Sequence, residues 1–383
     1  MADVTRGPNE KLIGKPGSRH ELSTPSLVLD LDALEANIGA MAEHARTHGY
    51  AVRPVAKIHK SIEVTRRQIA AGARGPCCAT LAESEVRADA GMSDVMLFTS
   101  VVTAPKLERL AVLNARTQGL VVVTDDASNV LQLAQAGRQS GRPLEVLVDI
   151  HVGGTRTGIA DEQRAVDLVR LVTETGGLEY AGLQGFAGGK MDTDDFDVRR
   201  TLIRERLQPL VRVVERLHEE GLPPRIVSGG STGTHDIDHE LGVLTEVQAG
   251  TYVFMDMNYQ GVALRRDDPF PFRPALSVRA TVISNARPGF VVTDAGLKEI
   301  DNLPAIEHAA IVWGAPMGAI YSLVGDDMGR IDFACTEDSM DVGNVVELMP
   351  PHCYQTAVLY SHYHVVRGDV LVDIWPVDAR DSW

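Results

Sequence analysis

The residues best suited to chemistry in this sequence form a short basic cluster, Arg53-Pro54-Val55-Ala56-Lys57-Ile58-His59-Lys60. A strand is expected at residues 52–55, so Lys57 would lie at the mouth of a strand among apolar neighbours. Burial there disfavours the ammonium form and leaves a neutral amine, the nucleophile of Schiff-base chemistry. A surface lysine near a strand end is the alternative reading, and position alone does not separate the two.

A glycine-rich segment later in the chain has the composition of a phosphate-binding loop. It reads Ser228-Gly229-Gly230-Ser231-Thr232-Gly233-Thr234 and follows an expected strand at 225–228. Glycines let backbone N–H groups approach an anion, and the hydroxyl groups add further donors. A second turn, Gln248-Ala249-Gly250-Thr251-Tyr252, could close over the same phosphate. A flexible turn is the alternative for the first segment, and Tyr252 could equally be a packed aromatic residue.

Two polar residues follow other expected strands. Arg156 comes after the strand expected at 145–150, and its planar donor fork could reach a bound ring or a carboxylate. Gln184 ends the strand expected at 180–185 and could contact the same ligand. A surface ion pair for Arg156 and an ordinary buried glutamine for Gln184 explain these positions as well.

A histidine in the last part of the chain raises the question of a metal. His352 is followed by Cys353 and Tyr354. In a strand, side chains at i and i+1 face opposite sides, and the i+2 partner here is tyrosine, a poor ligand for common divalent metals. His362 and His364 share a strand face, but lining a strand explains them better than metal binding. The segment alone therefore gives little support to a metal site.

Expected strands and helices alternate from residue 26 to about residue 265. The strands are expected at 26–29, 52–55, 75–79, 95–99, 119–124, 145–150, 180–185, 225–228 and 246–249, and the helices at 31–48, 61–71, 81–90, 105–115, 127–139, 161–175 and 197–220. Each helix is long enough to cross over between parallel strands. About eight such units predict an α/β fold, a closed (β/α)8 TIM barrel, with its active site at the carboxyl ends of the strands.

The pattern changes after residue 265. Prolines become frequent, and strands without long helices are expected at 277–285, 290–294, 345–349, 356–366 and 370–375. The turn Arg367-Gly368-Asp369 indicates antiparallel pairing. We therefore expect three parts: an N-terminal segment, 1–25, packed on the β domain; a barrel domain, 26–265; and a C-terminal β-rich domain, 266–383.

Composition restricts the classes of partner. The 383 residues carry a net charge of −15 without a basic stripe, which argues against nucleic acid. No apolar run reaches the length of a membrane span, and the polar N-terminus does not read as a secretory signal. Four cysteines are too few for a disulfide framework in a chain of this size, which indicates a reduced, cytoplasmic compartment.

Taken in order, these motifs resemble the D-threonine aldolase family of fold-type III pyridoxal-phosphate enzymes. Relatives of that family include 3-hydroxyaspartate aldolases and D-serine dehydratases, and the barrel is similar to that of alanine racemases. The resemblance extends from Thr24-Pro25-Ser26 to residues 375–380. It rests on Arg53-Pro54 with Ala56-Lys57, Gly75 with Cys77-Cys78, Arg156 with Gly158, Ser228-Gly229-Gly230 with Thr232-Gly233, 246–256, 294–298 and Pro351-His352.

By this resemblance Lys57 bonds pyridoxal 5'-phosphate as a Schiff base, residues 228–233 hold the phosphate, and His352 is the first metal ligand. Three positions depart from the family pattern. Val55 replaces a frequent histidine, Tyr354 replaces the aspartate or cysteine that is the second metal ligand, and 337–339 lack a usual histidine. These changes put a divalent metal (Mn2+, Mg2+ or Zn2+) in question. Base work would then pass to His352, His59, Tyr354 or Lys57.

The resemblance implies retro-aldol cleavage of β-hydroxy-D-α-amino acids, such as D-threonine or 3-hydroxyaspartate, to glycine and an aldehyde or oxoacid. The alternatives are β-elimination by a D-serine or 3-hydroxyaspartate dehydratase, an amino-acid racemase, and a non-catalytic carrier of pyridoxal phosphate. Such carriers usually consist of the barrel alone, so the β domain argues against the last. We also expect a homodimer, because relatives close the barrel mouth with a partner's β domain, and residues 256–260 could contribute across the interface.

Overall fold

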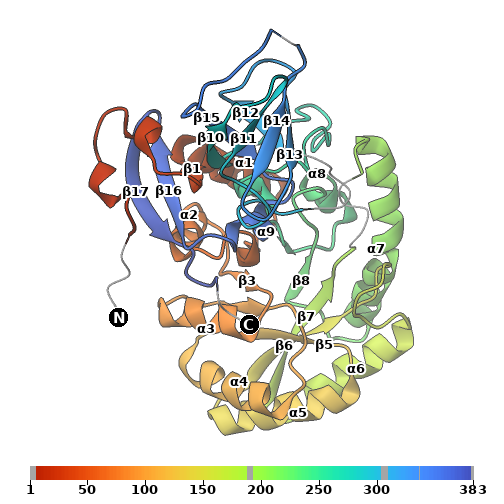
Figure 1. Cartoon of the computed structure of the whole chain (residues 1–383). Helices are drawn as coiled ribbons and strands as arrows, with labels where there is room; N and C mark the ends of the chain where they lie inside the picture. Colours follow the sequence, from red (N-terminus) through yellow and green to blue (C-terminus); the bar gives the residue numbers. More distant parts are fainter. Residues whose placement is uncertain (1–5, 188–192, 303–308, 336, 381–383) are drawn as a thin grey trace.

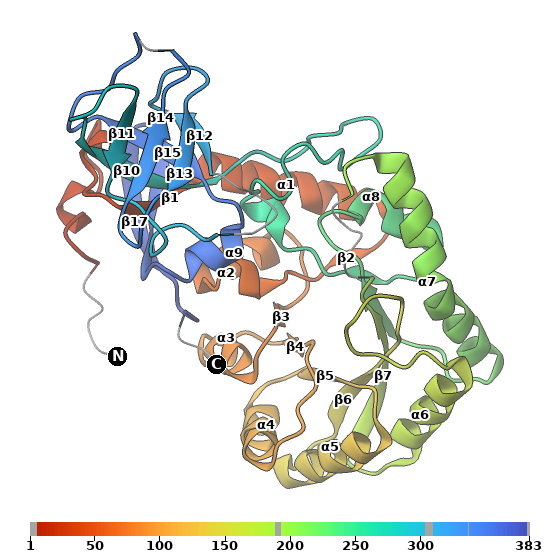
Figure 2. The same cartoon turned by 45° about the vertical axis from the view of Figure 1, so that its right-hand side comes forward.

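The structure is a computed structural model that describes residues 6–187, 193–302, 309–335 and 337–380. A barrel with its surrounding helices forms one side of the molecule, and a β-rich domain packs against it on the other (Figures 1 and 2). Within the described ranges, no helix combines the length and the apolar character needed to cross a bilayer.

Eight parallel strands form the barrel. They are β2 (Ala51–Val52), β3 (Cys77–Cys78), β4 (Met96–Leu97), β5 (Val121–Thr124), β6 (Leu144–Asp149), β7 (Leu178–Gly185), β8 (Ile226–Gly229) and β9 (Glu246–Val247). Their order is β2-β9-β8-β7-β6-β5-β4-β3. The two edges meet at a parallel bridge between Val55 and Cys77, where the Cys77 amide donates to the Pro54 carbonyl at 2.7 Å. The expected TIM barrel is therefore confirmed.

Seven long helices surround these strands, close to the expected bounds. They are α1 (Leu31–His48), α2 (Ile62–Ala70), α3 (Leu81–Asp89), α4 (Ala104–Arg116), α5 (Ala127–Ser140), α6 (Glu162–Glu174) and α7 (Phe196–Glu219). Helix α1 joins β1 (Ser26–Asp30) of the β domain to β2, and the other six connect consecutive barrel strands. All but α4 begin at an Asp, Ser or Thr whose side chain accepts a backbone N–H of the first turn. These caps explain why the starts of the helices could be predicted so closely.

The second domain is a nine-stranded, mostly antiparallel sheet. Its strands are β1 (Ser26–Asp30), β10 (Leu276–Ser284), β11 (Phe290–Thr293), β12 (Ala310–Trp313), β13 (Ile320–Leu323), β14 (Gly329–Asp332), β15 (Val345–Met349), β16 (His362–Arg367) and β17 (Val370–Pro376). The hairpin between β16 and β17 turns at Gly368, as expected.

The placement of β1 corrects an expectation. It was predicted as a barrel strand, but it pairs antiparallel with β10 and parallel with β16 in the β domain. Leu27, Val28 and Leu29 are all buried, so the strand presents apolar residues to both faces. Such a run identifies a strand without indicating which of two sheets it joins.

Two further differences concern the β domain. Residues 356–366 were expected to form one strand, whereas the chain forms the short helix α9 (Cys353–Ala357) before β16 begins. The strands β12, β13 and β14 were not expected. The N-terminal segment, with two 3-10 turns at Glu10–Leu12 and Ser18–Glu21, lies along β17, where the Gly14 amide donates to the Leu371 carbonyl at 2.8 Å.

One hydrophobic core joins the two domains. Leu27 and Leu29 of β1 and Leu276 of β10 belong to the same buried cluster as Val52 and Val247 of the barrel. Burial of this surface is the main force that fixes the β domain over the barrel mouth.

Candidate active site

A cavity of about 640 Å³ lies at the carboxyl ends of the barrel strands. Its walls come from the segments after β2, β3, β4, β6, β8 and β9, from the ends of β6 and β7, and from residues 352–354 at the start of α9 in the β domain. The lining residues are Val55, Lys57, Ile58, Ala79, Phe98, Thr99, Ser100, Asp149, Ile150, Arg156, Thr157, Gln184, Phe186, Ser231, Thr232, Gln248, Gly250, Thr251, Asn258, Tyr259, His352 and Tyr354. This is where a barrel enzyme places its active site.

Lys57 enters the cavity from a single 3-10 turn, Ala56–Ile58, directly after β2. Its Nζ lies 5.5 Å from the ring centroid of Phe98 and 5.8 Å from that of Tyr354. Burial lowers the pKa of this amine, and the charge of Arg156 lowers the pKa further. Both effects act in the direction of the neutral amine expected from the sequence.

Two neighbouring loops supply hydroxyl groups to the cavity. Ser231 and Thr232 follow β8, and Gly250 and Thr251 follow β9. The Thr232 Oγ1 also accepts the Tyr252 amide at 3.1 Å, which ties the two loops together. The two loops thus bring hydroxyl groups to the cavity from the segments in which a phosphate cradle was expected.

Five residues assigned to the cradle do not line the cavity. Gly229 and Gly233 are not among its lining residues, and Ser228 donates from Oγ to Glu246 at 2.7 Å inside the barrel. Gly230 has φ +69°, and a Cβ there would come within 2.2 Å of an Asp238 carboxylate oxygen. Tyr252 is a packed aromatic residue, the alternative reading, and its hydroxyl accepts the Gln68 amide at 2.8 Å.

Gln184 does line the cavity, as part of a polar wall that was not expected. Its side-chain amide donates to Asp149 at 3.2 Å, and its carbonyl oxygen accepts from Gln248 at 3.1 Å. Thr157 donates to the second carboxylate oxygen of Asp149 at 2.6 Å. Burial raises the pKa of Asp149 to about 6, although both hydrogen bonds lower the pKa. This wall faces Arg156, which lies over the ring of Phe186.

A buried ion pair supports the wall from inside the barrel. Arg53 makes two hydrogen bonds to Glu246, at 2.9 and 2.7 Å, and also reaches Asp94. Glu246 accepts from Ser228, which in turn accepts from Gln248 at 3.0 Å. The Arg53-Pro54 motif is thus part of the scaffold that holds β2, β8 and β9 together.

His352 lies in the cavity beside Tyr354, with the two ring centroids 5.9 Å apart. It caps α9, because its Nδ1 accepts the Tyr354 amide at 3.2 Å. Within the described residues, ligand atoms of Asp256, His352 and Cys353 lie within 4.8 Å of one another. The expectation that His352 and Cys353 diverge is therefore wrong, because they begin a helix instead of continuing a strand.

The structure does not bring His59 into the cavity. Its ring is buried against Phe254, and its Nδ1 accepts the Ser61 amide at 3.1 Å. Burial lowers its pKa to about 3. The reason is the 3-10 turn, in which Lys57 and His59 point in different directions.

Comparison with known proteins agrees with this geometry. Residues 29–258 match the family model of the alanine racemase N-terminal domain, and residues 275–366 match a serine dehydratase domain model. A D-threonine aldolase from Arthrobacter sp is 36% identical over 96% of this chain and 94% of its own length. The chain belongs to the D-threonine aldolase family.

Other members of this family have related activities. A 3-hydroxy-D-aspartate aldolase from Paracoccus denitrificans (strain Pd 1222) is 32% identical over 94% of this chain and 92% of its own. A D-threo-3-hydroxyaspartate dehydratase from Delftia sp. (strain HT23) is 29% identical over 92% and 97%. The crystal structure of D-threonine aldolase from Filomicrobium marinum has a TM-score of 0.90, with 33% identity over 94% and 97% of the two chains. The expected family is confirmed.

Family membership also fixes the class of enzyme. The chain is a pyridoxal-phosphate-dependent lyase of the D-threonine aldolase type, and its family acts on small amino acids. The cavity fits the cofactor, because a desolvated lysine and the hydroxyl groups of Ser231, Thr232 and Thr251 open into one space.

Several cavity residues were missed by sequence reasoning. Asp149 lies at the end of the strand expected at 145–150 and Thr157 lies in the loop after it, and this position was the only signal that could have found them. Gln248 had been named only as part of a turn expected to close over the phosphate. Phe98 and Phe186 read as ordinary apolar residues. Asp256, which completes the group around His352, had been considered only as an interface residue.

Proposed function

We propose that this lyase cleaves the Cα–Cβ bond of β-hydroxy-D-α-amino acids, releasing glycine and an aldehyde or oxoacid. The observation that carries the proposal is the position of Lys57, whose amine is buried in the cavity between Phe98 and Tyr354. Aldolases acting on D-threonine and on 3-hydroxy-D-aspartate are similar to this chain over nearly its whole length.

Pyridoxal phosphate would be held by Lys57 at one end and by Ser231, Thr232, Gly250 and Thr251 at its phosphate. When bound, it supplies the electron sink that stabilises negative charge at the substrate Cα. The polar wall of Gln184 and its partners would face the cofactor ring and fix its orientation.

Arg156 is the cation best placed to bind the substrate carboxylate. It lines the cavity, its charge is felt by Lys57, and a guanidinium binds a carboxylate through two parallel hydrogen bonds. With the substrate carboxylate held by Arg156 and the substrate amine bonded to the cofactor in place of Lys57, the bond of Cα that stands perpendicular to the cofactor plane would be fixed.

The proton of the substrate β-hydroxyl must leave as the Cα–Cβ bond breaks. Nζ of Lys57 can accept it, because burial and the charge of Arg156 lower the pKa of this amine and favour its neutral form. The Nδ1 of His352 already accepts a backbone N–H, so the neutral ring carries its proton on Nε2 and acts as a hydrogen-bond donor. Tyr354 places its phenol in the same cavity, where it can orient the β-hydroxyl.

A metal that binds the substrate hydroxyl does not fit the residues present. Tyr354 occupies the place of the second ligand, and a neutral phenol is a poor ligand for common divalent metals. Asp256 and Cys353 are fully buried behind His352 and do not line the cavity. We therefore propose that the proton transfer relies on the side chains named above.

A second candidate is β-elimination to a ketoacid and ammonia. It is favoured by the full-length similarity to a D-threo-3-hydroxyaspartate dehydratase. In that reaction Lys57 would remove the Cα proton instead. The same side chains would then hold the Cα–H bond, and not the Cα–Cβ bond, perpendicular to the cofactor plane.

We keep two further proposals from the sequence. The domains divide near residue 265, since the long β10 begins at Leu276 after a segment rich in prolines. A homodimer would cover the cavity, and Asn258 and Tyr259, which line it, fall in the segment expected at the interface. A solution mass that shows only monomer would contradict the dimer.

The experiment is a product assay on protein loaded with pyridoxal phosphate. D-threonine and D-serine are supplied separately, and acetaldehyde, glycine, pyruvate and ammonia are measured. Borohydride reduction followed by mass spectrometry locates the cofactor adduct. The matched variants are Lys57→Ala and Lys106→Ala, the second removing an exposed lysine of α4.

The proposal predicts a reduced adduct on Lys57 and acetaldehyde plus glycine from D-threonine, both lost in Lys57→Ala and kept in Lys106→Ala. Pyruvate and ammonia from D-serine without aldehyde from D-threonine would move the assignment to the dehydratases. Interconversion of enantiomers would indicate a racemase, and an adduct without any turnover would indicate a carrier.

A further inference from the structure

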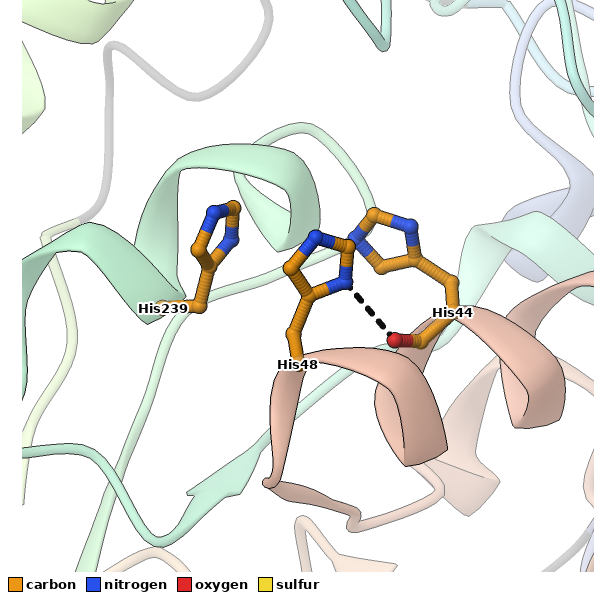
Figure 3. A group of neighbouring side chains, drawn as sticks. All are labelled: His44, His48 and His239. Carbon is orange, nitrogen blue, oxygen red and sulfur yellow. Dashed lines mark hydrogen bonds between the residues drawn. The ribbon is translucent and has the colours of Figure 1, made fainter.

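Three histidines gather on a part of the barrel domain that does not line the cavity. His44 and His48 project from the end of α1 toward His239, in the 3-10 turn His239–Leu241 that follows the short helix α8 (His235–Asp238) (Figure 3). Their ligand atoms all lie within 4.8 Å of one another. We propose that these three histidines bind a divalent transition metal of the zinc class.

The sequence places two of these side chains on one face. His44 and His48 are four residues apart in α1, so both point to the same side of the helix. Figure 3 shows the ring of His48 between the other two rings. The centroid of the His48 ring lies 4.1 Å from that of His44 and 4.0 Å from that of His239.

Two of the rings already offer a free lone pair. Nδ1 of His48 donates to the His44 carbonyl at 2.8 Å, which leaves Nε2 of the neutral ring without a proton. Nδ1 of His239 is buried and, among the described residues, has no hydrogen-bond partner. A ring nitrogen that is buried without a partner is costly unless a ligand satisfies it.

The surroundings favour the neutral form that coordinates metals. Burial lowers the pKa of His44 to about 3 and also lowers the pKa of His239, and the neighbouring histidines add to both effects. Imidazole ligands must be neutral to bind a metal, so the shifts at His44 and His239 act in the direction that favours coordination.

Two charged residues near the three histidines have opposite effects on a bound cation. Arg265 disfavours a cation, and its Nε donates to His235 at 3.0 Å. The carboxylate of Asp236 lies 3.5 Å from Nε2 of His44 and offers an oxygen ligand or a counter-charge. Imidazole nitrogens select zinc, nickel, copper or cobalt over magnesium and calcium, which prefer oxygen.

A tetrahedral zinc ion requires only modest side-chain movement. Zinc–nitrogen bonds of about 2.0–2.1 Å place ligand nitrogens about 3.4 Å apart. His48 and His239 are only half-buried, so their rings can turn toward one centre while the backbone stays in place.

The position of the site suggests a structural role. Thr234 donates from Oγ1 to Asp238 at 2.8 Å and accepts the Ser231 amide at 2.8 Å, so α8 and the loop before it form one unit. A metal between His48 and His239 would fasten this unit to α1. Since Ser231 and Thr232 line the cavity, the metal would stabilise one wall of the active site.

The test is a calorimetric titration of metal-stripped, full-length protein with Zn2+. It is run in the His352→Gln background, which removes the histidine of the cavity. The test variants are His48→Gln and His239→Gln, and the control is His218→Gln, an exposed histidine of α7. Circular dichroism checks that each variant is folded, and Mg2+ serves as the oxygen-preferring ion.

We expect about one Zn2+ per chain with a dissociation constant of about 1 µM or tighter. His48→Gln and His239→Gln should each weaken binding at least about tenfold, while His218→Gln leaves it unchanged. Zn2+ should also slow amide exchange in residues 231–241, and this protection should disappear in His48→Gln. Absence of Zn2+ binding, or binding that both test variants retain, would overturn the site.

Discussion

Nζ of Lys57 lies 5.8 Å from the ring centre of Tyr354, so a tyrosine of the β domain covers the amine that we expect to bond the cofactor. Tyr354 stands where the family's second metal ligand is expected. His352 remains in the cavity, but its Nδ1 is engaged by the Tyr354 amide. The tyrosine at position 354 therefore has two consequences: it covers Lys57, and it takes the place of a second metal ligand facing the substrate.

Restoring a ligand at this position should change the metal response. In Tyr354→Asp, a carboxylate two residues after His352 could share an ion with it, so chelator should lower the activity and Mn2+ should restore it. The wild type should respond to neither. Aldehyde release with and without chelator measures the effect. Tyr354→Phe is the control, because it adds no ligand and should remain indifferent to metal, and a wild type inactivated by chelator would refute the prediction.

The buried pair of Arg53 and Glu246 should matter for stability. In Glu246→Gln, Arg53 keeps its bonds to Gly75 and Asp94 but loses its charged partner in the barrel interior. We expect the free energy of unfolding to fall by about 3–5 kcal/mol. Urea titration followed by circular dichroism measures it. The exposed pair of Arg116 and Asp89 is the control, and Asp89→Asn should cost less than about 1 kcal/mol. Equal losses in both variants would contradict the account.

Asp149 should give the apoprotein a pH-dependent stability. Its folded pKa of about 6 exceeds the ordinary value of 3.8, so the folded state holds its proton more tightly. The stability that Asp149 contributes is therefore complete at low pH and declines as the pH rises from about 4 to about 6, by about 3 kcal/mol at most. In Asp149→Asn this decline should be absent, so the difference in unfolding free energy between wild type and variant should fall over this pH range. Asp125 raises and His151 lowers the pKa of the same carboxyl group, and both residues are kept unchanged in the variant. Parallel pH profiles of wild type and variant would disprove the assignment.

Gly250 should be intolerant of a side chain. A Cβ there would lie 2.5 Å from Cγ1 of Ile58 and 3.1 Å from Cβ of Val55, on either side of Lys57. In Gly250→Ala the turn that carries Lys57 must shift, and we expect cofactor affinity to fall about tenfold or more. Titration with pyridoxal phosphate measures the affinity. Gly39→Ala in α1 is the control, since no heavy atom lies within 4 Å of its Cβ position. Unchanged affinity in Gly250→Ala would show that the turn adapts.

The sequence predicted the barrel and the lysine because both depend on local signals. Side-chain caps such as Asp30 and Asp161 mark helix starts, and the pattern around Lys57 identifies a strand end. The β1 strand was misplaced because its apolar residues would suit either sheet. The α9 helix was missed because its cap is His352, a residue rarely used in that role, whereas Asp, Asn, Ser and Thr are common.

The inner part of the site could not be predicted, because it depends on contacts between distant residues. The side chain of Gln248 donates a hydrogen bond to that of Gln184, on another strand of the barrel. The backbone amide of Cys353 donates to the carboxylate of Asp256 at 3.0 Å. Neither pair has a sequence spacing that would suggest contact. His59 shows the opposite error, since proximity in sequence to Lys57 suggested a shared site that the 3-10 turn prevents.

The most direct test is aldehyde release from D-threonine and L-threonine by the protein loaded with pyridoxal phosphate, with a chelator present throughout. We predict acetaldehyde and glycine from the D enantiomer only, at a rate that Lys57→Ala abolishes. If neither enantiomer of threonine releases an aldehyde, and D-3-hydroxyaspartate analogues release none either, the proposed cleavage is contradicted.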